Sequence, residues 1–100
     1  MALTTLPDLS AARRLARVLV RERLCACVNI LPGLRSIYRW EGRVREDGEV
    51  LLVLKTSMAN GARLQARVLA LHPYEVPELI AWPLPRIAPA YARWLLDSTS

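Results

Sequence analysis

Apolar and polar residues follow two different periods along the chain, and the changes of period mark the expected helices and strands. A short apolar run at Leu3–Leu6 predicts a strand, which Pro7 ends, and Asp8 is a suitable N-cap for a following helix. The next apolar residues recur at i, i+3, i+4, i+7 and i+8, which is the spacing of one helical face. Those residues are Ala12, Leu15, Ala16, Leu19 and Val20.

Two further apolar runs predict the strands of a hairpin. Val28–Leu31 favours a strand and is followed by a break at Pro32–Gly33, after which polar and apolar residues alternate as far as Trp40. Val50–Leu54 is a continuous apolar run, and we expect such a strand to be covered on both faces.

Two dipeptides compete for the turn between these strands, Glu41–Gly42 and Asp47–Gly48. Local turn chemistry favours Asp-Gly, but only a turn at Glu41–Gly42 brings the two apolar runs together along one ladder. That turn pairs Val28 with Lys55. The pattern therefore predicts a long hairpin with a distortion near Pro32–Gly33.

The second half of the chain predicts another helix, a strand and a closing helix. Met58–Leu71 has helical spacing and must end by His72, because Pro73 disfavours the α conformation in the residue before it. Glu78–Trp82 is a candidate strand, and Ala90–Leu96 reads as a short helix. This β-α-β-β-α-β order with a C-terminal helix is typical of an α+β fold, the ferredoxin-like split β-α-β sandwich.

Length and composition predict a single domain of residues 1–100 that associates with other copies. Hydrophobic residues make up 53% of the chain, and a domain this small has too little interior to bury them all. The longest aliphatic run is far short of the roughly 20 residues that span a bilayer, and charges interrupt the N-terminal region, so neither a membrane nor a signal peptide is expected. Cys25 and Cys27 cannot form a disulfide framework, which favours a reducing, cytoplasmic setting.

The formal net charge is +5, and thirteen of the fourteen basic residues are arginine. Four of them lie on the outer face of the first predicted helix: Arg13, Arg14, Arg17 and Arg21. We interpret this as a solvated helix face, with binding of nucleic acid through these arginines, which would weaken steeply with salt, as the alternative. Nucleic acid is not an expected partner, because the strands carry no aromatic pattern of the RNA-recognition type.

The sequence contains few residues and motifs that could support catalysis, and we therefore predict that the protein is not an enzyme. His72 is the one histidine, and neither a G-x-S-x-G elbow nor a glycine-rich phosphate loop is present. Cys25, Cys27 and His72 are the softer metal ligands, but their spacing marks no closed site within one chain. A site shared between subunits and weak binding of copper or zinc both stay open, as does the alternative that His72 caps a helix end.

Four ordered motifs resemble those of the CutA family of divalent-cation tolerance proteins: Leu24–Gly33, Ser36–Gly42, Leu54–Thr56 and His72–Glu78. The resemblance covers essentially the whole chain. It implies a ferredoxin-like protomer that forms a homotrimer, an association with tolerance to copper and other divalent metal ions, and no established enzymatic reaction. No obligatory cofactor is implied.

The resemblance also implies site residues. Cys27 matches the family's recurrent cysteine, and His72 matches the histidine before proline, so these two are the candidate metal ligands. Thr4 and Leu71 stand where some bacterial members carry a cysteine and a second histidine, so a copper site built from that trio would lack two of its three ligands. An alternative is a small-ligand or signalling scaffold similar to the PII proteins, with clefts between subunits. The cleft candidates are Tyr38, Trp40, Lys55, Tyr74, Glu75 and Glu78.

Overall fold

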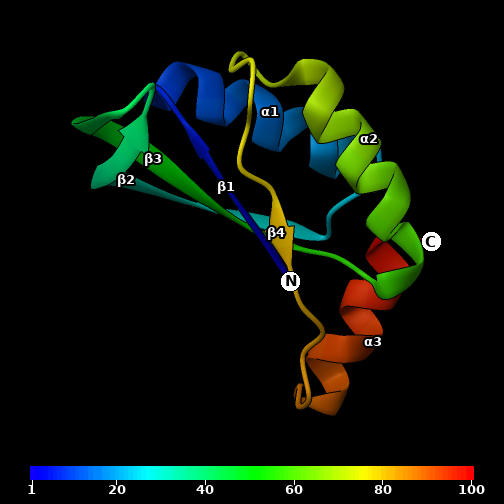
Figure 1. Cartoon of the computed structure of the whole chain (residues 1–100). Helices are drawn as coiled ribbons and strands as arrows, with labels where there is room; N and C mark the ends of the chain where they lie inside the picture. The colour runs from blue at the N-terminus through cyan, green and yellow to red at the C-terminus, as the bar shows by residue number, and fades with distance from the viewer.

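A computed structural model describes every residue from Met1 to Ser100, as a four-stranded antiparallel sheet with three helices (Figure 1). The strands lie in the order β2-β3-β1-β4. The elements are β1 (Ala2–Leu6), α1 (Leu9–Arg21), β2 (Cys27–Trp40), β3 (Arg43–Lys55), the 3-10 turn η1 (Met58–Asn60), α2 (Gly61–Leu71), β4 (Ile80–Ala81) and α3 (Pro89–Ser98). This order confirms the sequence prediction.

Helix α1 begins as its sequence predicts, and all but one of the residues predicted on its apolar face are buried. The Asp8 carboxylate accepts a hydrogen bond of 2.8 Å from the Ala11 amide and caps the first turn. Leu15 and Leu19 are buried in the core against the sheet. Val20 was expected on the same face, but it is exposed because its position on the helix turns it away from the sheet.

The hairpin of β2 and β3 has the predicted turn and the predicted distortion, but a different inner register. Trp40 pairs with Arg43 across the two-residue turn, whose Gly42 has a φ of +74°. The ladder shifts between Leu31 and Leu34, where the positive φ of Gly33 accommodates one extra residue on β2.

Because of this bulge, the pairing beyond it differs from the predicted pairing by one residue. Val28 pairs with Leu54, and not with Lys55 as a regular ladder would require. A shift of one residue exchanges the two faces of a strand. It places Val28 beside Leu54 on the helix side of the sheet, where both join the core.

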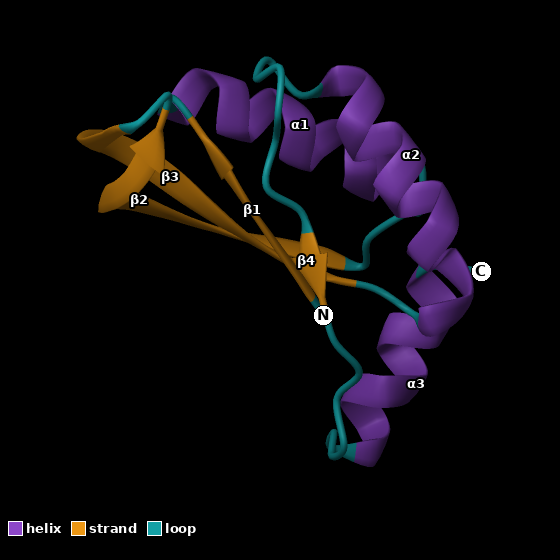
Figure 2. Ribbon diagram, in the orientation of Figure 1, coloured by secondary structure: helices purple, strands orange, loops and turns teal.

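Both helices α1 and α2 lie on one side of the sheet, and neither of them covers the other side (Figure 2). On β3, Val50, Leu52 and Leu54 are buried under the helices, whereas Leu51 and Val53 on the opposite face are only half-buried. The expectation that this strand is covered on both faces is therefore wrong for one protomer.

The second half of the chain differs from the prediction at its element ends. The predicted helix over Met58–Leu71 is divided into η1 and α2, and β4 is limited to Ile80–Ala81. The division occurs at Asn60, which is buried and whose amide donates to the carbonyls of Arg23 (3.2 Å) and Thr99 (3.0 Å). Asn60 thereby links the end of α1 to the C-terminus.

Candidate functional site

His72 occupies a buried position between β1 and the loop that follows α2. It stands at the C-cap position of α2, where its backbone amide donates to the Val68 carbonyl, and only 8% of it is exposed. Its ring Nε2 lies 2.8 Å from the Thr5 carbonyl oxygen, and its Nδ1 accepts a hydrogen bond of 3.1 Å from the Tyr74 amide. Both ring nitrogens are thus engaged within the protomer.

These two partners hold the His72 ring neutral. A carbonyl oxygen only accepts and an amide N–H only donates, so Nε2 carries the proton and Nδ1 carries the lone pair. Burial lowers the pKa of His72 from its usual value, and this outweighs the opposing effects of the Thr5 carbonyl and the Glu49 carboxylate. Metal coordination by either nitrogen would have to displace one of these hydrogen bonds.

Two tyrosines each donate to a carboxylate of β3, and one of these hydrogen bonds connects the His72 loop to the hairpin. The Tyr74 hydroxyl donates to the Glu49 carboxylate at 2.7 Å, and the Tyr38 hydroxyl donates to the Asp47 carboxylate. Burial and the hydrogen bond to Glu49 raise the pKa of Tyr74 well above its usual value, and the bond to Asp47 raises the pKa of Tyr38. The ring of Tyr74 also lies 4.9 Å from that of His72, so Glu49, Tyr74 and His72 form one connected group, whereas Tyr38 and Asp47 form a pair within the hairpin.

Asp47 and Glu49 were missed by the sequence analysis, although a signal for them exists. They are two residues apart on β3 and therefore share one face of the strand. The turn at Glu41–Gly42 places them beside the end of β2 that carries Tyr38, because Asp47 pairs with Ser36. The register of the hairpin was the information needed to find them.

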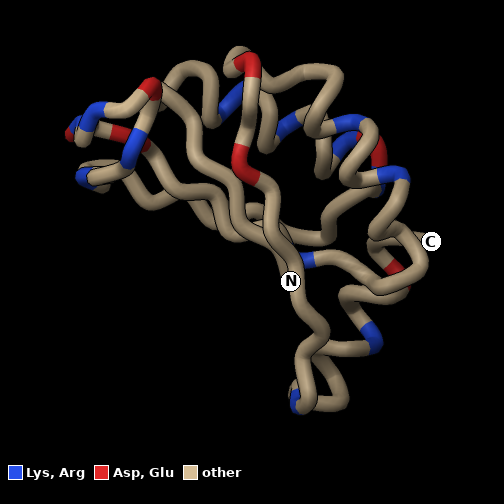
Figure 3. The backbone as a smooth tube through the Cα atoms, in the orientation of Figure 1, with Lys and Arg blue, Asp and Glu red and all other residues tan.

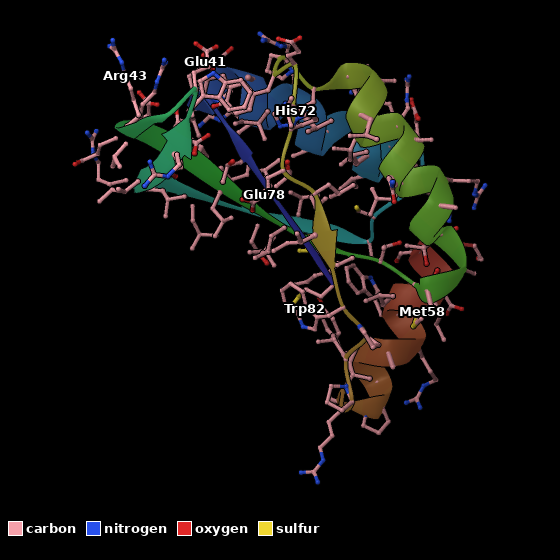
Figure 4. All side chains as sticks on the ribbon, viewed as in Figure 1. Glu41, Arg43, Met58, His72, Glu78 and Trp82 are labelled. Atoms are coloured by element: carbon pink, nitrogen blue, oxygen red, sulfur yellow. The ribbon has the colours of Figure 1, made fainter.

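The remaining cleft candidates do not join this group. Trp40 lies beside the hairpin turn, and the Lys55 ammonium lies 5.9 Å from the ring centre of Tyr91 in α3. Glu75 and Glu78 are exposed on the segment that leads from α2 to β4. Figure 4 shows His72 and Glu78 along this segment, with Trp82 beyond the end of β4.

The two cysteines differ sharply in their surroundings. Cys25 is 1% exposed, and burial raises the pKa of its thiol to about 12, so it stays protonated at neutral pH. Cys27 is half-buried and pairs with Lys55 across β2 and β3, which places it on the sheet face that the helices leave uncovered. Of the two thiols, only that of Cys27 is partly exposed.

The structure does not bring Cys27 and His72 together within one protomer. Cys27 is at the Lys55 end of the ladder, whereas His72 contacts Thr5, which pairs with Leu51. Four residues of a strand separate these two positions, about 13 Å along the sheet. No group of three histidine, cysteine or acidic side chains that could hold a metal ion occurs within the chain.

An apolar hollow lies beside the loop. Its volume is about 260 Å³, and it lies between the start of α1 and the end of α2. Leu71 and Pro73 close it on the loop side, and Arg14 is its only charged lining residue. None of its lining side chains is a ligand for a cation.

The lowered pKa of His72 predicts a pH-dependent part of the stability. Because the folded state disfavours the charged ring, the unfolded chain binds more protons below about pH 6.5. The contribution of neutral His72 is therefore complete above that pH and is lost as the pH falls below it. We expect the free energy of unfolding, measured by urea titration of metal-free protein at pH 7.5 and 5.5, to decrease more in the wild type than in His72→Gln. Equal decreases would contradict the assignment, whatever the stability of the variant at pH 7.5.

Comparison with known proteins connects this fold to one family. Residues 1–98 match the model of the CutA1 divalent ion tolerance protein. The chain is 50% identical over 99 residues to the divalent-cation tolerance protein CutA of Thermus thermophilus, covering 99% of this chain and 96% of the relative. It is 45% identical to the chloroplastic protein CutA of Arabidopsis thaliana and covers 95% of this chain but only 52% of that longer protein.

Solved structures agree with these sequence matches. The Thermus thermophilus Cut A1 structure superposes with a TM-score of 0.95, covering 99% of this chain and 96% of the other. CutA1 from Oryza sativa, 43% identical, superposes with a TM-score of 0.96 and covers 99% of this chain and 91% of the other. No helix of this chain has the length and apolar character needed to cross a membrane.

Proposed function

The chain belongs to the CutA1 divalent ion tolerance family, and from this we propose that it acts as a non-enzymatic homotrimer in the response to divalent metal ions. The match of residues 1–98 to the family carries this proposal. The protomer would then be the ferredoxin-like unit of the trimer. The family is one of divalent-cation tolerance proteins and is not a known enzyme family.

The uncovered sheet face supports the trimer. Leu31 is 46% exposed, and Leu51 and Val53 lie beside it on the same face without a covering layer. Monomeric soluble proteins rarely leave a contiguous apolar surface of this kind in water. The unpaired outer edge of the long strand β2 adds backbone groups that another subunit can pair with.

We propose that copper or zinc binds weakly through Cys27 and His72 of different subunits. The two residues are too far apart in one protomer for a single ion, and Cys27 lies on the face assigned to the assembly. Copper and zinc suit thiolate and imidazole ligands. Binding should be weak, because His72 must first release either the Thr5 carbonyl or the Tyr74 amide.

A calorimetric titration with zinc tests this site, since zinc does not oxidise thiols. We expect the reduced, metal-free protein to bind Zn²⁺ in the micromolar range, and Cys27→Ser to weaken the affinity by about tenfold or more, because it removes a ligand. Cys25→Ser is the matched control. It should leave the affinity unchanged, because the Cys25 thiol is buried and protonated.

The outcomes separate the metal site from the family assignment. An unchanged affinity in Cys27→Ser, or equal losses in both serine variants, would remove Cys27 from the site. The absence of any zinc binding would contradict the proposal that the protein binds metal ions directly. The protein would then act in metal-ion tolerance only indirectly. The two free thiols also favour a reducing compartment, and we propose the cytoplasm.

A further inference from the structure

Helices α1 and α2 carry the whole positive excess of the chain. They contain six arginines and no carboxylate: Arg13, Arg14, Arg17, Arg21, Arg63 and Arg67. The formal charge of the full chain is +5, so the residues outside these helices sum to −1. Figure 3 shows basic residues following one another along the two helices, whereas acidic residues are found mainly on the hairpin and the loop after α2.

The arginines of α1 form an ordered, unpaired surface. Arg13, Arg17 and Arg21 are at i, i+4 and i+8, which places them in one row about 6 Å apart along the helix. Arg14 lies beside this row and donates only to the Ser10 hydroxyl, at 3.1 Å. All four guanidinium groups are exposed, and none forms a salt bridge. We call these four residues the arginine face.

We propose that the arginine face binds the phosphate backbone of double-stranded nucleic acid without reading its sequence. Guanidinium groups pair with phosphate oxygens through two parallel hydrogen bonds. A straight row of such groups can follow one strand of a duplex, and contacts to phosphate alone carry no sequence information. The missing aromatic pattern in the strands is therefore no obstacle to this mode of binding.

The composition of the two helices distinguishes this partner from other polyanions. Neither helix contains an aromatic residue, so the surface has no platform on which unpaired bases can stack and no aromatic anchor for a protein interface. The apolar face of α1, including Leu15 and Leu19, is in the core and is not free to enter lipid. The surface therefore suits a partner whose exposed groups are regularly spaced phosphates, as in a nucleic-acid duplex.

The position of the arginine face is compatible with the proposed trimer. It lies on the side of α1 that faces away from the sheet, because Leu15 and Leu19 on the opposite side pack against it. The apolar sheet face assigned to association lies on the other side of the molecule (Figure 2). A duplex and the partner subunits would therefore use different surfaces.

Fluorescence anisotropy with a labelled 20-base-pair duplex tests the proposal. Four phosphate contacts predict a slope of about −3.6 for the logarithm of the association constant against the logarithm of the salt concentration. We expect the same slope for duplexes of unrelated sequence. In Arg13→Gln/Arg17→Gln the slope should fall to about −1.8, and the affinity at 20 mM salt should drop by about 100-fold or more.

A second double variant distinguishes the effect of the arginine face from the effect of the net charge of the protein. Arg39→Gln/Arg43→Gln removes the same charge from exposed positions of the hairpin, and its affinity and slope should equal those of the wild type. Equal losses in the two double variants, or no binding at 20 mM salt, would overturn the proposal. So would tighter binding to phosphatidylserine vesicles or to poly-glutamate than to the duplex.

Discussion

Leu52→Ala is expected to lower the free energy of unfolding by about 2–5 kcal/mol, the range for truncating a fully buried leucine. Leu52 lies in the central part of β3, is 0% exposed, and belongs to the core between the sheet and α1. Its strand is bonded on both sides, pairing with Thr4 of β1 and Ile30 of β2. The surroundings therefore cannot close around the missing methyl groups, and a cavity remains.

Chemical denaturation at one fixed protein concentration measures this loss, because association adds its own stabilisation. Leu69→Ala is the control, since it makes the same chemical change at a position of α2 that is 47% exposed. That variant should differ from the wild type by about 0.5 kcal/mol or less. A loss below 1 kcal/mol in Leu52→Ala would mean that the core is not centred on β3.

Leu51→Arg is expected to have the opposite consequence, with an intact fold and a lost assembly. Leu51 is adjacent to Leu52, but it points to the uncovered face, beside Leu31 of the neighbouring strand. In the monomer an arginine there reaches water. In the proposed trimer it would be a buried charge without a partner, at a cost of several kcal/mol.

Sedimentation at micromolar concentration distinguishes these states. The wild type should sediment with the mass of three 11.3 kDa chains and Leu51→Arg with the mass of one, while both give the same circular dichroism. Val20→Arg is the matched control. Val20 is exposed on the helix side of the molecule, and the substitution adds the same positive charge there. A trimeric Leu51→Arg would exclude this face from the assembly, and a monomeric wild type would refute the trimer itself.

The local structure of this chain follows from patterns that short segments contain. The spacing of Leu15 and Leu19 predicts which side of α1 is buried, and the position of Pro73 predicts that α2 ends before His72. The hairpin turn was predictable because only one turn joins the two apolar runs. The bulge was located near Pro32–Gly33, but its effect on the register was not, since pairing depends on how many residues the bulge inserts.

The candidate site was only partly predictable, because its contacts join distant segments. His72, Tyr74 and Tyr38 were singled out from the sequence. The structure connects His72 with Tyr74, whereas Tyr38 bonds to Asp47 within the hairpin. Their acidic partners on β3 were not identified, since a carboxylate on an exposed strand has no local feature that marks it as a partner. Cys27 and His72 were paired as ligands, but they stand on separate parts of the protomer.

By itself the sequence determined the element order, the hairpin turn, the buried side of α1 and the family, because periodicity, turn residues and motif spacing are local properties. The tertiary structure decided which groups meet: His72 contacts Thr5, 67 residues away, and Tyr74 contacts Glu49, 25 residues away. It also decided which sheet face stays open. These features depend on register and on the side taken by the helices, and both arise from packing over the whole chain.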